Sequence, residues 1–295
     1  MIKNLCEIPS PSGEEKNIKE FIRNELKDFT DSYYEDVFGN LIFIKHGRGK
    51  RICIECGIDE QFLMINQNSN NVLRFSAPNF IKASDFVDKT VLFKDKTQCV
   101  ITSEVSEGIK HCHLFASAKS KSVGESATLL PCFFEDDENY KAFNIKYKAP
   151  VGVLINGIKA LKKNTNEIYF VFSVQKILSN RGVRALMQSG IEFDKAICIA
   201  CVDDSEKGVA VVVKEQSAVI TPEVKNELLY IAKSKGIPVR LMLTDENFNM
   251  KTYLAEGYGA PCGLICIPCA DNSVNKNDIK SAEKLIVAMC ESEAI

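Results

Sequence analysis

Apolar positions recur at two different spacings along the chain, and the spacing changes twice. From Ile18 to Phe29 they return every three or four residues, which predicts an amphipathic helix over residues 13–29. Ser12 and Glu15 stand before it in the pattern of a capping box. Two short apolar runs follow, at residues 41–45 and 51–56. The glycine-containing loop between them predicts that these two strands pair as a hairpin.

The helical spacing then disappears and returns. Residues 62–134 hold short β-prone pieces separated by Asn, Ser, Gly and Lys, which predicts a small all-β unit. After Pro150, which suits a first helical turn, an amphipathic helix is expected. Strands and helices then alternate to the end of the chain, with strands expected at 168–174, 196–202, 208–213, 239–243 and 262–267, and helices around 181–188, 222–235 and 277–290.

Continuous apolar strands between amphipathic helices are typical of a sheet that is covered on both faces. The pattern therefore predicts an α/β fold that is interrupted by an all-β insertion. We expect residues 1–61 and 147–295 to form the α/β domain and residues 62–146 to form the inserted domain.

Composition and charge narrow the class of protein. The 295 residues are 45% apolar and 26% charged, as in ordinary globular proteins, and no apolar run reaches the length of a membrane span. The first residues lack the pattern of a secretory signal, so a cytoplasmic location is expected. With 37 basic and 39 acidic residues the net charge is −2, which gives no strong field for nucleic acid. We expect neither nucleic acid nor a membrane as a partner.

The twelve cysteines are expected to be thiols, because the chain is long and the expected compartment is reducing. Several lie inside apolar runs, where a thiol packs as a small hydrophobic group. Only three histidines occur, and a histidine-rich metal site would have to use them: His46, His111 and His113.

A series of short motifs covers nearly the whole chain in a fixed order. They are IPSPSGEE (8–15), DVFGNLI (36–42), ICIECGIDE (52–60), VGESATLLP (123–131), FVFSVQ (170–175), NRG (180–182), TD (244–245) and GAPCGLICIP (259–268). In this order the chain resembles the glutamyl-aminopeptidase and cellulase-M-like metallopeptidases, peptidase family M42, which include the tetrahedral aminopeptidases.

The resemblance implies a three-layer α/β domain with a central mixed sheet and an inserted barrel-like domain that mediates oligomer assembly. It also implies two divalent metals, typically zinc or cobalt, at the carboxyl edge of the sheet, where they would activate a water molecule. Two His, two Asp and one Glu would bind them, and a neighbouring Glu would act as the general base.

This chain departs from that pattern at the first three ligand positions. The first His falls on Gly57. The Asp that would bridge the two metals falls on Lys148 or Ala149. The general base and the next ligand, both Glu in the family, fall on Lys176 and Ile177.

The remaining two ligands are lost as well. The second Asp aligns with Ala200, and the last His aligns near Asn272. Asp59 is retained, but in the family it orients the missing His and does not bind metal alone. A positive charge at Lys176 would also oppose a dication. We therefore expect no metal and no other cofactor.

Two other groups of residues resemble metal sites, and both have a plainer interpretation. Cys56, Cys201, Cys269 and Asp271 at strand ends would be a relocated ligand set, but cysteines that are flanked by Ile and Ala in apolar runs are usually core. The run from His111 to His113 would need further ligands from elsewhere, and a surface strand explains it.

Lys176 has two interpretations as well. It would be a base with a lowered pKa, or it would form a structural ion pair with Asp59, which we favour.

Two functions remain open at this point. The favoured one is a non-catalytic member that keeps the scaffold, assembles as a homo-oligomer or with an active paralogue, and binds a peptide or small molecule in the old cleft. The alternative is a metal-dependent aminopeptidase or other hydrolase with relocated ligands.

Overall fold

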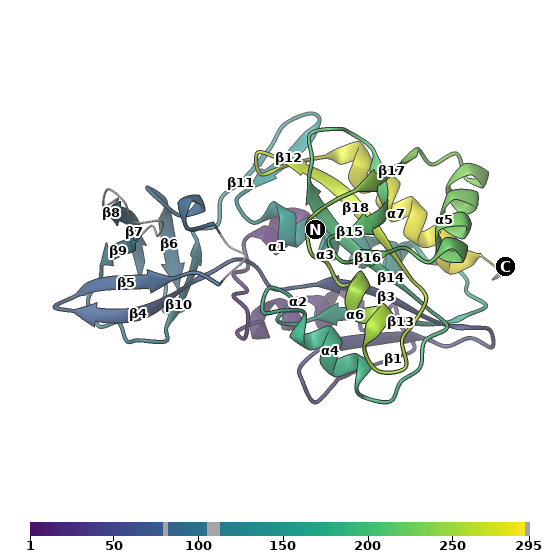
Figure 1. The fold of residues 1–295 in the computed structure, drawn as a ribbon, viewed down its shortest axis with the longest axis horizontal. Helices are drawn as coiled ribbons and strands as arrows, with labels where there is room; N and C mark the ends of the chain where they lie inside the picture. Colours follow the sequence, from purple (N-terminus) through teal and green to yellow (C-terminus); the bar gives the residue numbers. More distant parts are fainter. Residues whose placement is uncertain (79–81, 105–112, 293–295) are drawn as a thin grey trace.

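The computed structural model describes residues 1–78, 82–104 and 113–292. It contains an α/β part and a barrel-like part, which stand side by side along the long axis of the molecule (Figure 1). Each has its own sheet and its own cluster of buried apolar side chains. The expected α/β class, with a central mixed sheet and a barrel-like insertion, is confirmed.

The larger sheet contains twelve strands in the described residues, in the order β1-β2-β13-β3-β14-β18-β19-β12-β11, and β15 joins β18, β16 and β17 beside this path. Strands β13, β3, β14 and β18 run parallel to one another, so their carboxyl ends meet at one edge. The strands are β1 (Ser32–Glu35), β2 (Leu41–Lys45), β3 (Arg51–Gly57), β11 (Phe133–Glu135), β12 (Asn139–Ala142), β13 (Glu167–Ser173), β14 (Lys195–Asp203), β15 (Val209–Glu215), β16 (Ala218–Val219), β17 (Val239–Leu243), β18 (Cys262–Ala270) and β19 (Ser273–Asn275).

Two groups of helices pack against this sheet. Helices α3, α5 and α7 contact one another through α7, helices α4 and α6 form a second pair, and members of both groups contact β14 or β18. In the described part of the chain, no helix combines the length and apolar character needed to cross a membrane. The helices are α1 (Ile2–Cys6), α2 (Lys16–Leu26), α3 (Ile145–Ala160), α4 (Arg181–Met187), α5 (Pro222–Ser234), α6 (Met250–Ala255) and α7 (Lys276–Glu291).

The smaller sheet is antiparallel and nearly closes on itself, because its order is β7-β6-β10-β4-β5-β9-β8 and β7 also contacts β9. Alternate side chains point inward and form a separate core around Leu63, Leu73 and Phe86. The elements are β4 (Leu63–Ser69), β5 (Val72–Ser76), the 3₁₀ turn η1 (Ala83–Asp85), β6 (Thr90–Phe93), β7 (Gln98–Val100), β8 (Thr102–Glu104), β9 (His113–Ser117) and β10 (Ser126–Leu129).

The predicted hairpin of residues 41–45 and 51–56 is wrong. Strand β13 lies between β2 and β3, antiparallel to the first and parallel to the second. The loop that joins β2 to β3 crosses over the start of β13, where the backbone amides of Arg48 and Gly49 donate to the carbonyl of Thr165. Two strands with a short connection need not pair when a third, largely apolar strand lies between them.

The predicted capping box is also wrong. Helix α2 begins at Lys16, and no side chain caps it. Ser12 donates instead to Asp59, and the Glu15 carboxylate accepts from the backbone amides of Gly13 (2.8 Å) and Gln175 (3.0 Å). Both side chains therefore bind distant loops, which a local motif cannot anticipate.

Helix α3 begins at Ile145, so Pro150 lies inside the helix and not in its first turn. The hairpin of β11 and β12 falls within the predicted insertion, residues 62–146, yet β12 pairs with β19 in the larger sheet. The last strand of the smaller sheet along the chain is therefore β10, which precedes this hairpin. The short helices α1 and α6 were not predicted.

Candidate functional site

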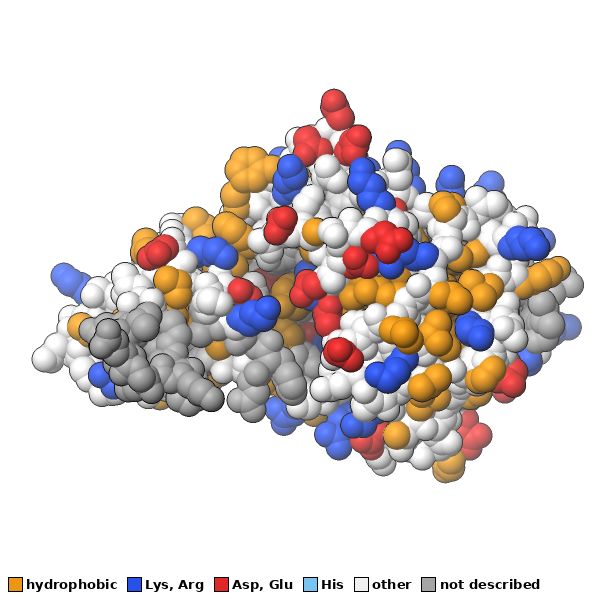
Figure 2. Space-filling view, turned by 45° about the horizontal axis from the view of Figure 1, so that its top comes forward, with side chains coloured by type: hydrophobic (Ala, Val, Ile, Leu, Met, Phe, Trp, Pro, Cys, Tyr) orange, Lys and Arg blue, Asp and Glu red, His pale blue; other side chains and the backbone are white. Residues whose placement is uncertain are grey.

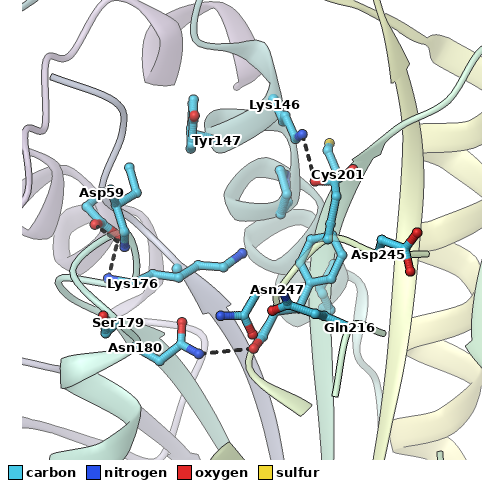
Figure 3. A pocket seen from close by; sticks show the side chains of 16 residues that line it. Asp59, Lys146, Tyr147, Lys176, Ser179, Asn180, Cys201, Gln216, Asp245 and Asn247 are labelled. Carbon is cyan, nitrogen blue, oxygen red and sulfur yellow. Dashed lines mark hydrogen bonds and ion pairs between the residues drawn. The ribbon is translucent and has the colours of Figure 1, made fainter. Parts of the chain in front are cut away.

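A pocket of about 320 Å³ lies at the carboxyl edge of the parallel strands, and we call it the edge pocket. Its walls come from the loops after β3, β13, β15 and β17, from β14, and from α3 (Figure 3). The end of parallel strands is where open α/β sheets generally bind ligands. The lining residues are Gly57, Asp59, Lys146, Tyr147, Pro150, Lys176, Ile177, Ser179, Asn180, Ile199, Cys201, Gln216, Asp245, Glu246, Asn247 and Phe248.

Asp59 holds the loop that follows β13. Its buried carboxylate accepts the backbone amides of Lys176 (3.0 Å) and Ile177 (2.9 Å) and the hydroxyl of Ser12. Burial raises the pKa of Asp59, and these hydrogen bonds act in the opposite direction. Gln175, just before, has a φ of 52°, an uncommon backbone conformation for a residue other than glycine. The carboxylate therefore fixes the position from which Lys176 extends.

Lys176 and Gly57 fit together in the edge pocket. A Cβ atom at position 57 would lie 2.5 Å from Cδ and 2.9 Å from Cβ of Lys176, so only glycine leaves room for the lysine stem. The ammonium lies 5.2 Å from the centre of the Phe248 ring, within the range of a cation–π contact. Figure 3 shows the side chain extending across the pocket.

The expected ion pair between Lys176 and Asp59 is not formed. The salt bridges among the described residues include none of Lys176, and the hydrogen bond between these two residues uses the backbone amide of Lys176. The carboxylate of Asp59 accepts the backbone amides of residues 176 and 177, whereas the side chain of Lys176 carries its ammonium away from Asp59 (Figure 3).

Two buried glutamates lie behind the pocket wall. Glu55 accepts from Asn249 (2.7 Å) and from the hydroxyl of Ser173, and Glu215 accepts from the backbone amides of Phe248 (3.1 Å) and Lys251 (2.9 Å). Burial raises the pKa of both carboxyls, while the charge of Lys176 lowers it. The sequence analysis missed both, although an acidic residue inside an apolar strand was a signal for a buried charge.

Lys146 carries the other positive charge of the pocket, and it is paired. Its ammonium lies 2.7 Å from the carboxylate of Asp203 and 2.9 Å from that of Glu246. Burial lowers the pKa of Lys146, but these two acids outweigh it and the net shift is upward. Glu246 also accepts the backbone amide of Asp203 (2.8 Å), so the three residues form one network.

Comparison with known proteins decides the family. The sequence profile of the M42 glutamyl aminopeptidases matches residues 116–285. A provisionally named aminopeptidase of Acetivibrio thermocellus is 30% identical, over 98% of this chain and 98% of its own. This chain belongs to the M42 glutamyl aminopeptidase family.

Solved structures have the same fold. An aminopeptidase of the archaeon Desulfurococcus kamchatkensis superposes with a TM-score of 0.90 at 22% identity, over 99% of this chain and 94% of its own. The TET1 peptidase of Pyrococcus horikoshii, which can assemble into a tetrahedron or a large octahedral shell, gives 0.86 at 20% identity, over 99% and 98%. At these identities the likeness concerns the fold alone.

The positions that the sequence analysis assigned to the M42 metal site do not all meet. Gly57, Asp59, Lys176 and Ile177 line the edge pocket. The other four do not line it. Ala149 and Ala200 are buried in the core, Asn272 lies in the exposed turn between β18 and β19, and Lys148 lies in a separate buried cluster.

Lys148 is fully buried in that cluster. Its ammonium donates to the hydroxyl of Ser10 and lies 3.3 Å from the carboxylate of Glu60. Glu60 in turn accepts from the backbone amide of Ser10 (2.9 Å) and from Asn144 (2.7 Å). We call these four residues the Lys148 cluster.

A divalent metal site needs several anionic or imidazole donors that converge on one point. Among residues 1–78, 82–104 and 113–292, no group of three or more His, Cys, Asp and Glu side chains is placed to hold one. Cys56, Cys201 and Cys269 are buried, and burial raises the pKa of their thiols, to about 12 for Cys269. His111 and Cys112 lie outside the described residues, as does the side chain of His113.

Proposed function

We propose that this M42 chain is a non-catalytic member of its family, which binds a small molecule in the edge pocket and assembles with further copies of itself. One observation carries the proposal: the stem of Lys176 lies over Gly57 in the middle of the pocket, at the positions where the family resemblance implies a metal ligand and a general base. An ammonium there opposes a divalent cation by charge repulsion.

The remaining acids do not fit the two metals of the family. Asp59 is committed to two backbone amides and Ser12, and Glu246 is committed to Lys146 and the amide of Asp203. Glu55 and Glu215 are buried behind the wall and do not line the pocket. Among the lining acids of the described chain, Asp245 is the one without a hydrogen bond or ion pair, and no three His, Cys, Asp or Glu side chains there are grouped to hold a metal. One free carboxylate does not supply the ligands of two metals.

Assembly is supported by two observations. The TET1 peptidase of similar fold can assemble into a tetrahedron or a large octahedral shell. Three exposed apolar side chains, Val219, Leu241 and Leu243, lie on β16 and β17, and Figure 2 shows apolar side chains gathered over the α/β part of the visible face. Exposed apolar groups that lie together commonly mark contacts between proteins. A homo-oligomer, or an assembly with an active paralogue, is the form that we propose.

The first experiment measures metal content and peptidase activity together. The purified, untagged protein is incubated with excess zinc, cobalt or manganese, dialysed, analysed by mass spectrometry and assayed with aminoacyl substrates. We expect less than stoichiometric metal and no hydrolysis. Roughly stoichiometric metal with turnover would establish the alternative, a metal-dependent aminopeptidase with relocated ligands.

Native mass spectrometry tests the assembly. We expect a mass that is a multiple of the 32.9 kDa of one chain. We expect Leu243→Lys to shift the distribution towards smaller species, because it places a charge among the exposed apolar side chains of β16 and β17. A monomer at all concentrations would refute this part of the proposal.

A further inference from the structure

The ammonium of Lys176 differs from the other buried or half-buried ammonium groups nearby. Lys146 has two carboxylates and Lys148 has one, each within ion-pair distance. Within the described residues, the contact recorded for the ammonium of Lys176 is the face of Phe248, and no carboxylate lies within 4.0 Å. A side chain with three donors therefore extends into the pocket without an anion to accept them.

The lysine is held in place before any ligand arrives. Asp59 binds the backbone amides of residues 176 and 177, Gly57 leaves room for the stem, and the ring of Phe248 faces the ammonium. Little conformational freedom remains to be lost on binding, which favours affinity. Such an arrangement is typical of a side chain that recognises a ligand.

The charges around it select the kind of anion. The pocket is lined by two lysines, Lys146 and Lys176, and by three acids, Asp59, Asp245 and Glu246, and Lys146 is already neutralised. Glu55 and Glu215 lie behind the wall and feel the charge of Lys176, but neither is within ion-pair distance of it. A phosphate or dicarboxylate would bring a second negative charge close to these acids, whereas one carboxylate matches the one unpaired ammonium.

The neutral part of the ligand has partners as well. The amide side chains of Gln216 and Asn247 are exposed at the pocket, and in the part of the chain that the structure describes neither makes a side-chain hydrogen bond. Figure 3 shows both among the side chains that line the pocket with Lys176. They can donate to and accept from an amide or hydroxyl group next to the carboxylate.

We infer that the edge pocket binds a small organic monocarboxylate that also carries an amide, with its carboxylate on the ammonium of Lys176. This inference rests on the proposed function, because a pocket that held two metals would bind its ligand through them.

The test compares acids with their neutral amides. The full-length protein is titrated calorimetrically with N-acetyl-L-alanine and N-acetyl-L-alanyl-L-alanine, and with the corresponding C-terminal amides. We expect each acid to bind at least tenfold more tightly than its amide. Inorganic phosphate and succinate are titrated in parallel and should bind more weakly than the acids.

Variants locate the binding at Lys176. Lys176→Met should weaken the binding of the acid at least tenfold and leave that of the amide unchanged. The control Lys207→Met removes an exposed lysine that pairs with Glu138, and it should bind as the unchanged protein does. Gly57→Ala keeps the ammonium but displaces the lysine stem, so it should also weaken the binding of the acid. Circular dichroism and thermal melting establish that each variant is folded.

Several results would overturn the inference: equal affinity for acid and amide in both pairs, undiminished binding of the acid to Lys176→Met, or phosphate bound as tightly as the acids. The same preparations are analysed for metal and hydrolysis. A metal-free, inactive protein that does not prefer the acids would refute the carboxylate ligand alone, whereas metal-dependent turnover would refute the non-catalytic function itself.

Discussion

Lys148 and Lys176 both stand where the family resemblance implies an acidic group or its neighbour, yet they lie in two different surroundings. Lys148 is fully buried and its charge is matched by Glu60 inside a cluster of hydrogen bonds. Lys176 is half-buried in the edge pocket, and its ammonium faces the aromatic ring of Phe248. A buried ammonium that loses its partner destabilises the fold strongly. One that borders a pocket and has no partner is available to a ligand.

Two neighbouring acidic residues of the loop after β3 contact the surroundings of the two lysines. Asp59 turns to the amides of residues 176 and 177, and Glu60 turns to Lys148 and Asn144. The same acidic pair thus fixes the pocket loop on one side and neutralises a buried lysine on the other. Four predictions test this difference, and they are given from the largest expected effect to the smallest.

Lys148→Met should cause the largest loss of stability. It leaves the carboxylate of Glu60 buried without its cation, and removing one partner of a buried pair typically costs about 3–5 kcal/mol. Urea denaturation measures the free energy of unfolding. Lys207→Met, at an exposed ion pair, serves as the control and should cause no measurable change. Equal effects of the two variants would show that the Lys148 cluster is not structural.

Asp59→Ala should have an intermediate effect on stability and a clear effect on the pocket. It leaves two backbone amides and the hydroxyl of Ser12 without their acceptor, at a cost of about 2 kcal/mol. Because the loop then no longer fixes Lys176, binding of N-acetyl-L-alanine should weaken as well. Unfolding and calorimetry of the same sample measure both. A fully stable variant with unchanged binding would refute the role of Asp59.

The buried glutamates behind the pocket predict a smaller, pH-dependent effect. Burial raises the pKa of Glu55 and Glu215 above the ordinary value of 4.5, so the folded state holds these protons to higher pH than the unfolded state does. Their contribution to stability is therefore lost as the pH rises from 4.5 through the raised pKa values. Unfolding free energies measured across this window should fall less steeply for Glu55→Gln. The control Glu20→Gln, at an exposed residue, should follow the unchanged protein.

Lys176→Met should change stability least, because no ion pair is lost and only the longer-range attraction to Glu55 and Glu215 is removed. Lys176→Glu should restore no peptidase activity, since the other ligand positions of the family still lack metal-binding side chains. Urea denaturation measures the stability of Lys176→Met. Hydrolysis of aminoacyl substrates in the presence of added cobalt measures the activity of Lys176→Glu. Hydrolysis gained by this single substitution would count strongly against a non-catalytic protein.

The helices and strands themselves follow from local pattern. The apolar runs at 196–202 and 262–267 are strands β14 and β18, and the helices expected at 222–235 and 277–290 are α5 and α7. The loss of helical spacing at residues 62–134 marks the barrel-like part. The series of short motifs also predicts the M42 family, which the comparisons confirm.

The order of the strands and the direction of each charged side chain depend on the whole fold. The sequence alone determines periodicity, and thereby element type, because a local repeat of apolar residues needs only one buried face. It does not determine that β13 separates β2 from β3, that Glu55 and Glu215 lie behind one pocket, or that Lys148 meets Glu60 while Lys176 meets none. These contacts join residues far apart in the chain, so only the packing of the complete sheet and its helices decides which charges are paired and which one remains for a ligand.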